Sequence, residues 1–424
     1  TSTVIMGLQP HPIKEFCFGC IFILSRRAAV PKIRVKDSVQ LQIIRTGQMD
    51  HPLPWTGPSV SRFLSRSTEL GVDPELFGAL DLGTNNCRLM IATQTAGGFR
   101  VVDSFTRTVR LGEGLHHTGR LSDDAMSRTL EALQICADRL ARRKVGMFQA
   151  VATEACRRAV NGPDFIARAQ AAAGFDIHII SGREEACLAV ESCANLIHNN
   201  RFGPLRNRAL LFDIGGGSTE IAWIRTESSQ QTESLIGYLS LPVGVVTLSE
   251  QFGPMDSLSP ARYREMVDHT RKFLHDFENV HRIRSEIRRD QVRLIGTSGT
   301  VTTLASLILN LPRYARAAVD GSLLPAASAR LAMRKLQGMG LENIENHTCI
   351  GPDRAPFVLP GCAIFEAIHD IWPMQDIIVA DRGLRDGMIL RMLRKASPLS
   401  RRLLRSQRSG QALSTQNLMQ ATGL

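Results

Sequence analysis

The chain has 424 residues, 43% of them hydrophobic and 21% charged, which excludes a disordered or fibrous protein and leaves room for two domains with full cores. The formal net charge is +11, but the excess positive charge lies at the two ends of the chain. Residues 1–70 hold nine Lys and Arg against four Asp and Glu, and seven basic residues and no acid follow Asp386. Residues 71–390 carry a net charge of −1, so the total charge is weak support for a nucleic-acid partner. The longest apolar run, Phe16 to Leu24, is about half the roughly 18 residues that cross a bilayer, so we expect no membrane span.

Residues 1–70 show no hydrophobic period, and they are rich in Arg and Ser, poor in acids and interrupted by His-Pro, Leu-Pro and Gly-Pro pairs. This composition is typical of a targeting or non-native leader, and we expect the segment to be poorly ordered. Cys17 and Cys20 form a C-x-x-C without a second ligand pair nearby, so chance spacing is favoured over a structural or redox role. The nine cysteines show no disulfide framework, which fits a reducing cytoplasm.

An α/β pattern begins at Glu75. Residues 76–82 predict a buried strand that runs into a glycine turn, and residues 88–93 predict the returning strand of a hairpin. A helix is expected over 121–142, with Ser122 as its N-cap. Further strands are expected over 148–153 and 176–180, and further helices over 164–173 and 184–197.

The same order of elements then starts again. A strand over 209–214 meets three glycines, a strand over 220–225 returns, and a helix over 260–279, a strand over 292–295 and a helix over 301–309 follow. This duplication predicts an α/β fold with two domains that face each other across a cleft. We place the first domain over residues 75–195, the second over 196–395 and a basic tail over 396–424.

Two glycine turns carry the pattern of phosphate-binding hairpins. They read Asp81-Leu-Gly-Thr-Asn-Asn and Asp213-Ile-Gly-Gly-Gly-Ser-Thr-Glu, and glycine lets backbone N–H groups approach a bound anion closely. The expected phosphate contacts are Gly83, Thr84, Asn85, Gly215, Gly216, Gly217, Ser218 and Thr219, while Asp81 and Asp213 are placed to hold a hydrated Mg²⁺. One such motif is more often an ordinary hairpin, but two in register favour the phosphate interpretation.

A third glycine-rich turn, Gly296-Thr-Ser-Gly-Thr, lies between a predicted strand and a predicted helix. Gly296, Ser298 and Gly299 are candidate phosphate contacts, because a helix N-terminus is itself an anion site. The alternative is a capped helix start with Thr300 as N-cap, and the two interpretations are compatible.

These motifs, taken together, resemble the exopolyphosphatase/guanosine pentaphosphatase family, a branch of the actin/hexokinase/heat-shock ATPase superfamily with actin-like (ribonuclease H-like) domains. The resemblance covers about residues 75–393, in the order of the family. The matching segments are Ala79 to Ala92, Val109-Arg-Leu-Gly-Glu-Gly-Leu, Ala152-Thr-Glu-Ala-Cys-Arg-Arg-Ala, Ile179-Ile-Ser-Gly-Arg-Glu-Glu-Ala, Phe212 to Ile221, Leu241-Pro-Val-Gly, Gly296 to Thr300 and Gly383-Leu-Arg-Asp-Gly.

The resemblance implies a role for each matching residue. Glu185 would be the general base that activates water, and Glu184 a solvated acid favoured by the helix dipole. Arg157 would contact phosphate, and Glu220 would hold the metal through water. The cofactor would be Mg²⁺, or Mn²⁺ in its place.

The implied activity, in the stringent response, is removal of the terminal phosphate from polyphosphate or conversion of guanosine pentaphosphate to tetraphosphate. The cysteine pattern favours the cytoplasm, and apolar faces expected near the C-terminus would suit a homodimer. The sequence does not rank the two substrates. Only a basic tail follows Leu393, in place of the extra helical domains of long family members, which weakens the case for processivity. A superfamily kinase and a non-catalytic polyphosphate or nucleotide sensor are the alternatives. His116 and His117 predict an exposed turn rather than a metal site.

Overall fold

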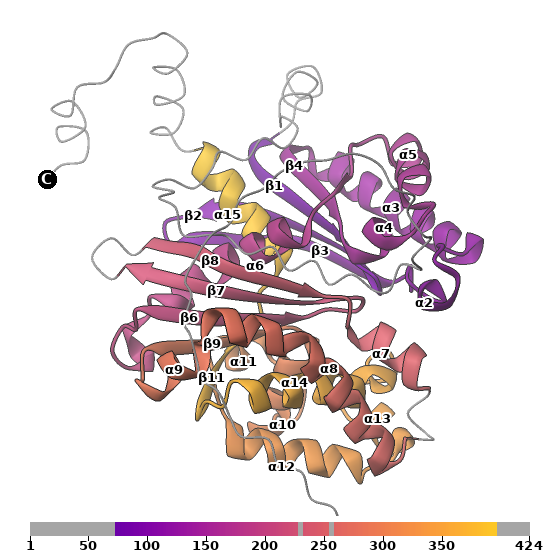
Figure 1. Ribbon diagram of the computed structural model, residues 1–424. Coiled ribbons are helices and arrows are strands. Elements are labelled where there is room, and N and C mark those ends of the chain that lie inside the picture. Colours follow the sequence, from indigo (N-terminus) through magenta and orange to yellow (C-terminus); the bar gives the residue numbers. More distant parts are fainter. Residues whose placement is uncertain (1–72, 228–231, 254–257, 397–424) are drawn as a thin grey trace, which may run out of the picture. The chain divides into compact units, whose positions relative to one another are not determined.

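The computed structural model describes residues 73–227, 232–253 and 258–396 (Figure 1). The expectations for residues 1–70, with their C-x-x-C, and for the basic tail after Ala396 lie outside these ranges. Within them, the strands form two sheets, of five strands in the order β3-β2-β1-β4-β5 and of six in the order β10-β11-β9-β6-β7-β8. No described helix is long and apolar enough to cross a membrane.

The first sheet and its helices form the first lobe. Its strands are β1 (Asp73–Leu82), β2 (Asn86–Thr95), β3 (Gly98–Thr108), β4 (Val145–Ala152) and β5 (His178–Ile179), and its helices are α2 (Leu115–Thr118), α3 (Asp123–Arg143), α4 (Glu154–Arg158) and α5 (Gly162–Ala173). The predicted hairpin is confirmed as β1 and β2, in which Asp81 lies opposite Arg88. Ser122 caps α3 as predicted, because its hydroxyl accepts the N–H of Ala125 at 3.3 Å.

The second sheet and its helices form the second lobe. Its strands are β6 (Arg208–Ile214), β7 (Thr219–Glu227), β8 (Thr232–Leu241), β9 (Val292–Thr297), β10 (Leu323–Pro325) and β11 (Asp376–Ala380). Its helices are α7 (Val245–Phe252), α8 (Pro260–His281), α9 (Ile283–Arg288), α10 (Gly299–Ile308), α11 (Arg316–Val319), α12 (Ala326–Gln337), α13 (Leu341–Glu345) and α14 (Val358–Ile371), with short 3₁₀ turns η1 (Asn200–Phe202) and η3 (Ala355–Phe357). In the β6–β7 hairpin, Asp213 lies opposite Glu220.

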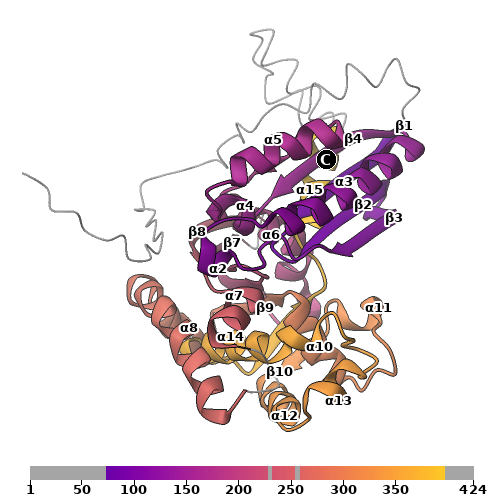
Figure 2. The ribbon, with the colours of Figure 1, turned by 90° about the vertical axis from the view of Figure 1, so that its right-hand side faces the viewer.

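Two helices exchange between the lobes. Helix α6 (Gly182–Ile197) follows the first sheet in the chain, but Ala186, Ala189 and Cys193 pack against the second. Helix α15 (Leu384–Ala396) follows the second sheet and packs against the first, beside β1 and β2 (Figure 2). The two helices touch so closely that a Cβ at Gly387 would lie 2.2 Å from the carbonyl oxygen of Leu188. The expected domain boundary near residue 195 therefore assigns α6 and α15 by their order in the chain, whereas each of them packs on the sheet of the other lobe.

Each lobe contains its own apolar core. The first core packs β1, β2 and β4 against α3 and α5, and the second packs the larger sheet against α8 and α14. Helix α14 is buried on nearly every side, which explains its almost uninterrupted apolar sequence. The predicted α/β fold with two domains facing a cleft is confirmed.

Candidate active site

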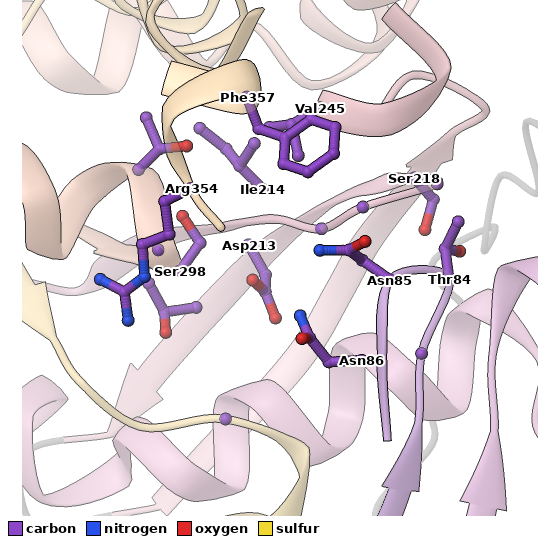
Figure 3. A pocket seen from close by; sticks show the side chains of 18 of the residues that line it. Thr84, Asn85, Asn86, Asp213, Ile214, Ser218, Val245, Ser298, Arg354 and Phe357 are labelled. Atoms are coloured by element: carbon purple, nitrogen blue, oxygen red, sulfur yellow. The ribbon is translucent and has the colours of Figure 1, made fainter. Parts of the chain in front are cut away.

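A pocket of about 230 Å³ takes its walls from both lobes (Figure 3). The predicted site residues that line it are Asp81, Gly83, Thr84, Asn85, Glu185, Asp213, Gly215, Gly216, Gly217, Ser218, Glu220, Ser298 and Gly299. In Figure 3, Asp213 lies between Ser298 on one side and Asn85 and Asn86 on the other. The three glycine turns thus converge on one space.

The two phosphate hairpins pack directly against each other. A Cβ at Gly217 would lie 2.4 Å from the hydroxyl oxygen of Thr84, and one at Gly216 would lie 3.3 Å from the Thr84 Cβ. Side chains at these positions would therefore push the hairpins apart. The run of three glycines serves this close approach as well as leaving backbone N–H groups accessible to an anion.

Three of the predicted phosphate contacts do not line the pocket: Thr219, Gly296 and Arg157. Thr219 is fully buried and its hydroxyl donates to the carbonyl oxygen of Val243 at 2.6 Å. Gly296 lies within β9, where a Cβ would come within 2.6 Å of the ring of Phe212. Both residues thus serve packing beneath the site, because they lie on strands just outside the turns.

Several polar atoms of the pocket lack a hydrogen-bond partner. Buried polar groups are normally paired, yet Asp81 Oδ1, Asn85 Oδ1 and Ser298 Oγ make no hydrogen bond. Ser298 also has a φ of +115°, a strained conformation for a residue with a side chain. It occupies the N-cap of α10 without capping it, so the alternative of Thr300 as N-cap is wrong, since the helix begins at Gly299. Unpaired atoms and strain at one place are typical of a site that binds a ligand.

Four of the carboxyl residues that line the pocket, Asp81, Asp213, Glu185 and Glu220, belong to the hairpins and the start of α6. Burial raises the pKa of Asp81. Burial and the charge of Asp81 raise the pKa of Asp213 to about 6. Burial and the charge of Asp213 raise the pKa of Glu220, and burial and the charge of Glu220 raise the pKa of Glu185 well above its ordinary value. The site therefore resists carrying all four negative charges at once.

The first turn of α6 directs Glu185 into the pocket. Glu184 completes a capping box with Ser181, because its carboxylate accepts the Ser181 N–H at 2.8 Å. Glu184 was expected to be a solvated acid of the first turn, and the structure shows that it caps the helix. Gly182 allows the helix start to meet β8, where a Cβ would lie 2.7 Å from the Cβ of Ser240. The side chain of Glu185 is 10% exposed, as suits a base with a raised pKa.

Arg157 holds Glu185 instead of lining the pocket. Its Nη1 donates to Glu185 Oε2 at 3.2 Å and to the carbonyl oxygen of Ile180 at 2.7 Å. Its Nε and Nη2 both donate to Glu154 Oε2, at 3.1 and 2.5 Å. The guanidinium is therefore engaged by protein groups, with Glu154 as a partner that the sequence analysis did not identify.

The described residues contain no group of three or more His, Cys, Asp or Glu side chains close enough to form a metal cage. Mg²⁺ ordinarily keeps several waters and uses one or two carboxylates together with substrate phosphates. The unpaired Oδ1 of Asp81 and the raised pKa of Asp213 fit such a site. Glu220 is less available, because its Oε1 accepts the hydroxyl of Ser240 at 2.9 Å.

A second part of the pocket, here called the apolar wing, was not predicted from the sequence. Val245, Phe357 and Arg354 lie near Ile214 in this part (Figure 3), and Val358, next to Phe357 in the chain, adds apolar surface. Leu304, Leu336, Asp353 and Cys362 complete it. Val245 directly follows the Leu241-Pro-Val-Gly segment, which was the one available signal, whereas residues 353–358 carry no motif.

Pocket residues Asn86, Arg88 and Arg382 were not predicted as site residues, although Asn86 and Arg88 lie within the segment Ala79 to Ala92 and Arg382 adjoins the segment that begins at Gly383. Arg88 lies opposite Asp81 in the hairpin, and the position of a cation beside the first acid was the usable signal. His116 and His117 do not line the pocket.

Comparison with known proteins agrees with this geometry. The model of the Ppx/GppA phosphatase family matches residues 90–396. A solved Ppx/GppA family member from Aquifex aeolicus is 26% identical, with 76% of this chain and 99% of that chain covered and a TM-score of 0.62. An exopolyphosphatase-like protein is 26% identical, with 78% and 98% covered and a TM-score of 0.65.

An exopolyphosphatase from Cytophaga hutchinsonii shares the fold, with 22% identity, 76% of this chain and 99% of that chain covered and a TM-score of 0.66. The family match extends over more than half of the 424 residues. The resemblance drawn from the motifs is therefore confirmed, and the chain belongs to the Ppx/GppA phosphatase family.

Proposed function

We propose that this chain removes the terminal phosphate of guanosine pentaphosphate or of inorganic polyphosphate in the cytoplasm, with Mg²⁺ as cofactor. The observation that carries the proposal is the convergence of both glycine hairpins and the buried carboxyl of Glu185 on one pocket. A terminal phosphoanhydride presents the same end group in both substrates, so the same residues serve either.

In the proposed mechanism, the backbone N–H groups of Gly216 and Gly217 and the hydroxyls of Thr84 and Ser218 hold the terminal phosphate, while the N–H of Gly215 closes the hairpin by donating to the carbonyl oxygen of Ser218 at 2.9 Å. Glu185 accepts a proton from the attacking water and orients it in line with the leaving oxygen. Arg157 fixes the carboxylate of Glu185 for this step. Mg²⁺ near Asp81 and Asp213 would neutralise phosphate oxygens. Because the transition state is loose, positioning and charge neutralisation contribute more than base strength.

The apolar wing favours the nucleotide over bare polyphosphate. A polyphosphate chain has no apolar part, whereas a purine base has flat apolar faces and a polar edge. Phe357 offers a ring near Ile214 and Val245, and Arg354 lies on the side of Ile214 that faces away from the hairpins (Figure 3). Asp353, next to Arg354 in the chain, also lines the pocket. We therefore propose that the wing receives the base and ribose while the hairpins hold the phosphates.

The test is phosphate release, with Mg²⁺ and without an acceptor, from matched concentrations of guanosine pentaphosphate, polyphosphate, ATP and a phosphomonoester. We expect release from the first two, with the lower KM for the nucleotide. Phe357→Ala should raise KM for the nucleotide by about tenfold and leave polyphosphate hydrolysis unchanged. Leu331→Ala, at an exposed side chain of α12, is the control. Release from the monoester alone would exclude an anhydride substrate, and consumption of ATP only with an acceptor would indicate a kinase.

A further inference from the structure

We propose that Glu250 is a positioning residue of this site, which links the two phosphate hairpins from outside the pocket by accepting the N–H of Gly114 across the lobes. Gly114 belongs to the first lobe, at the start of α2, and Glu250 to α7 of the second. Helices α2 and α7 lie side by side in both views (Figures 1 and 2). Neither residue lines the pocket.

The first half of the link is the segment 109–114, which is bound to the first hairpin. The N–H groups of Val109 and Arg110 donate to the carbonyl oxygen of Asn85 at 2.9 and 3.0 Å, and that of Gly112 donates to Thr84 at 2.9 Å. A Cβ at Gly112 would lie 2.3 Å from the Cγ2 of Thr84. These three bonds and the close approach of Gly112 place the segment directly behind the hairpin.

A side chain of α3 holds the same segment from the other side. Arg128 donates from Nε to the carbonyl oxygen of Val109 at 3.1 Å and pairs through Nη2 with Glu113 at 2.8 Å. The segment is thus bonded both to the first hairpin and to a long helix of the first lobe. A displacement of Gly114 should therefore also displace Thr84 and Asn85, because hydrogen bonds connect this segment to both residues.

The second half of the link is α7, whose first turn is bound to the second hairpin. The N–H of Val245 donates to Gly215 at 3.0 Å, and that of Val246 donates to Gly216 at 2.8 Å. A Cβ at Gly244 would lie 2.3 Å from the carbonyl oxygen of Gly216. Helix α7 therefore moves with the glycine run of the second hairpin, and Glu250 lies on its second turn.

One hydrogen bond closes the link. Gly114 N–H donates to Glu250 Oε1 at 2.8 Å, and the φ of Gly114 is +73°, a left-handed conformation that glycine adopts without a steric cost. The other carboxylate oxygen, Oε2, is buried and makes no hydrogen bond. A carboxylate enclosed in this way gains more from its single donor than one that water surrounds.

The inference rests on the proposed function, because it assumes that both hairpins hold one phosphate. Displacements of about 1 Å at a reacting group lower rates by about a hundredfold, so the register between the hairpins controls the chemical step. Glu250 would stabilise the aligned arrangement without touching the substrate. Its loss should therefore lower kcat more than it changes KM.

The experiment compares Glu250→Ala, Glu250→Gln and Glu131→Ala in the full chain. The amide oxygen of Gln still accepts an N–H, and Glu131 is a matched control with a 72% exposed side chain in a surface pair with Arg107. We expect Glu250→Ala to lower kcat by about tenfold to a hundredfold, with KM within about threefold of the parent. We expect Glu250→Gln to regain most of the loss, and Glu131→Ala to match the parent.

A second measurement does not depend on activity. Hydrogen exchange followed by mass spectrometry should show faster exchange in the peptide around Gly114 for Glu250→Ala, and near-parent exchange for Glu250→Gln. Unchanged exchange at Gly114 in Glu250→Ala, or parent-like kcat in that variant, would overturn the proposal. If the parent releases no phosphate from any substrate, the proposed function fails while the exchange result still decides whether the link exists. If Glu250→Ala does not fold, Glu250→Gln decides. Parent-like exchange at Gly114 in Glu250→Gln together with a large loss of kcat in that variant would also overturn the proposal.

Discussion

Without a divalent cation, the protein should lose stability as the pH rises from 5 to 8. The folded-state pKa of Asp213 is about 6, above its ordinary value of 3.8. A carboxyl shifted upward stabilises the fold fully below its ordinary pKa, and that contribution is lost as the pH rises through the folded value. The pKa values of Asp81, Glu185 and Glu220 shift in the same direction, so their contributions add to this loss.

The size of the effect follows from the shift. For Asp213 alone, the difference between 3.8 and about 6 corresponds to about 3 kcal/mol lost between strongly acid pH and pH 8. Because the unfolded carboxyl is already ionised at pH 5, about half of this, about 1.5 kcal/mol or about 2 °C in Tm for a chain of this size, is lost between pH 5 and pH 8. A cation that binds the ionised carboxylates contributes about 2.7 kcal/mol at 100 times its Kd. Mg²⁺ should therefore restore most of the loss at pH 8 and contribute little at pH 5, where protonated carboxyls bind it weakly.

The assay is thermal unfolding at pH 5 and pH 8, with EDTA or with Mg²⁺. Asp213→Asn should lose less stability between the two pH values and gain less from Mg²⁺ than the parent. Asp138→Asn, at an exposed position of α3, should behave as the parent. Equal stabilisation by Mg²⁺ at both pH values would refute the reasoning, as would an EDTA-treated parent whose Tm does not fall relative to Asp213→Asn.

Three further predictions concern single residues. Glu185→Gln should lower kcat by about 10²- to 10⁴-fold and keep substrate binding, measured by phosphate release and by calorimetric titration; a parent-like rate would exclude Glu185 as the base. Gly217→Ala should destabilise the hairpin contact by about 1–3 kcal/mol and lower kcat/KM, because its Cβ would meet Thr84, whereas Gly97→Ala, with no atom within 4 Å, should change neither. Glu154→Ala should lower the free energy of unfolding, measured in urea, by about 2 kcal/mol, because both hydrogen bonds to Arg157 are lost. The control Glu131→Ala, at an exposed side chain, should lower it by less than about 1 kcal/mol. Equal losses in the two variants would contradict the role assigned to Glu154.

The parts of the site that the sequence predicted are those encoded in a few adjacent residues. Strand, glycine turn and returning strand occupy about a dozen consecutive positions, so both hairpins and the acids Asp81 and Asp213 were identified by local pattern. Their repetition along the chain then predicted two lobes. The capped start of α3 at Ser122 and the position of Glu185 in the first turn of α6 follow from the same kind of local signal.

The parts that escaped prediction depend on contacts between distant segments. The apolar wing combines residues from α7, α10, η3 and α14, and each of its side chains alone is indistinguishable from ordinary core. Arg157 was expected to contact phosphate, but Glu154 and Glu185 engage its donors, which no spacing rule reveals. Strands β10 and β11 were missed because they are short and join the sheet far from their neighbours in sequence.

The exchange of α6 between the lobes has a consequence for how the site works. Glu185 follows the strands of the first lobe in the chain, yet its helix packs on the sheet that carries Asp213 and Glu220. The base is therefore fixed relative to the second hairpin, and an opening of the cleft would separate it from the first lobe, including Thr84, Asn85 and its partner Arg157. The second hairpin and Glu185 thus keep their relative positions, and alignment of the site depends on where the first hairpin lies relative to them. Bonds that cross the lobes, such as Gly114 to Glu250 and Arg157 to Glu185, are placed where that register is set.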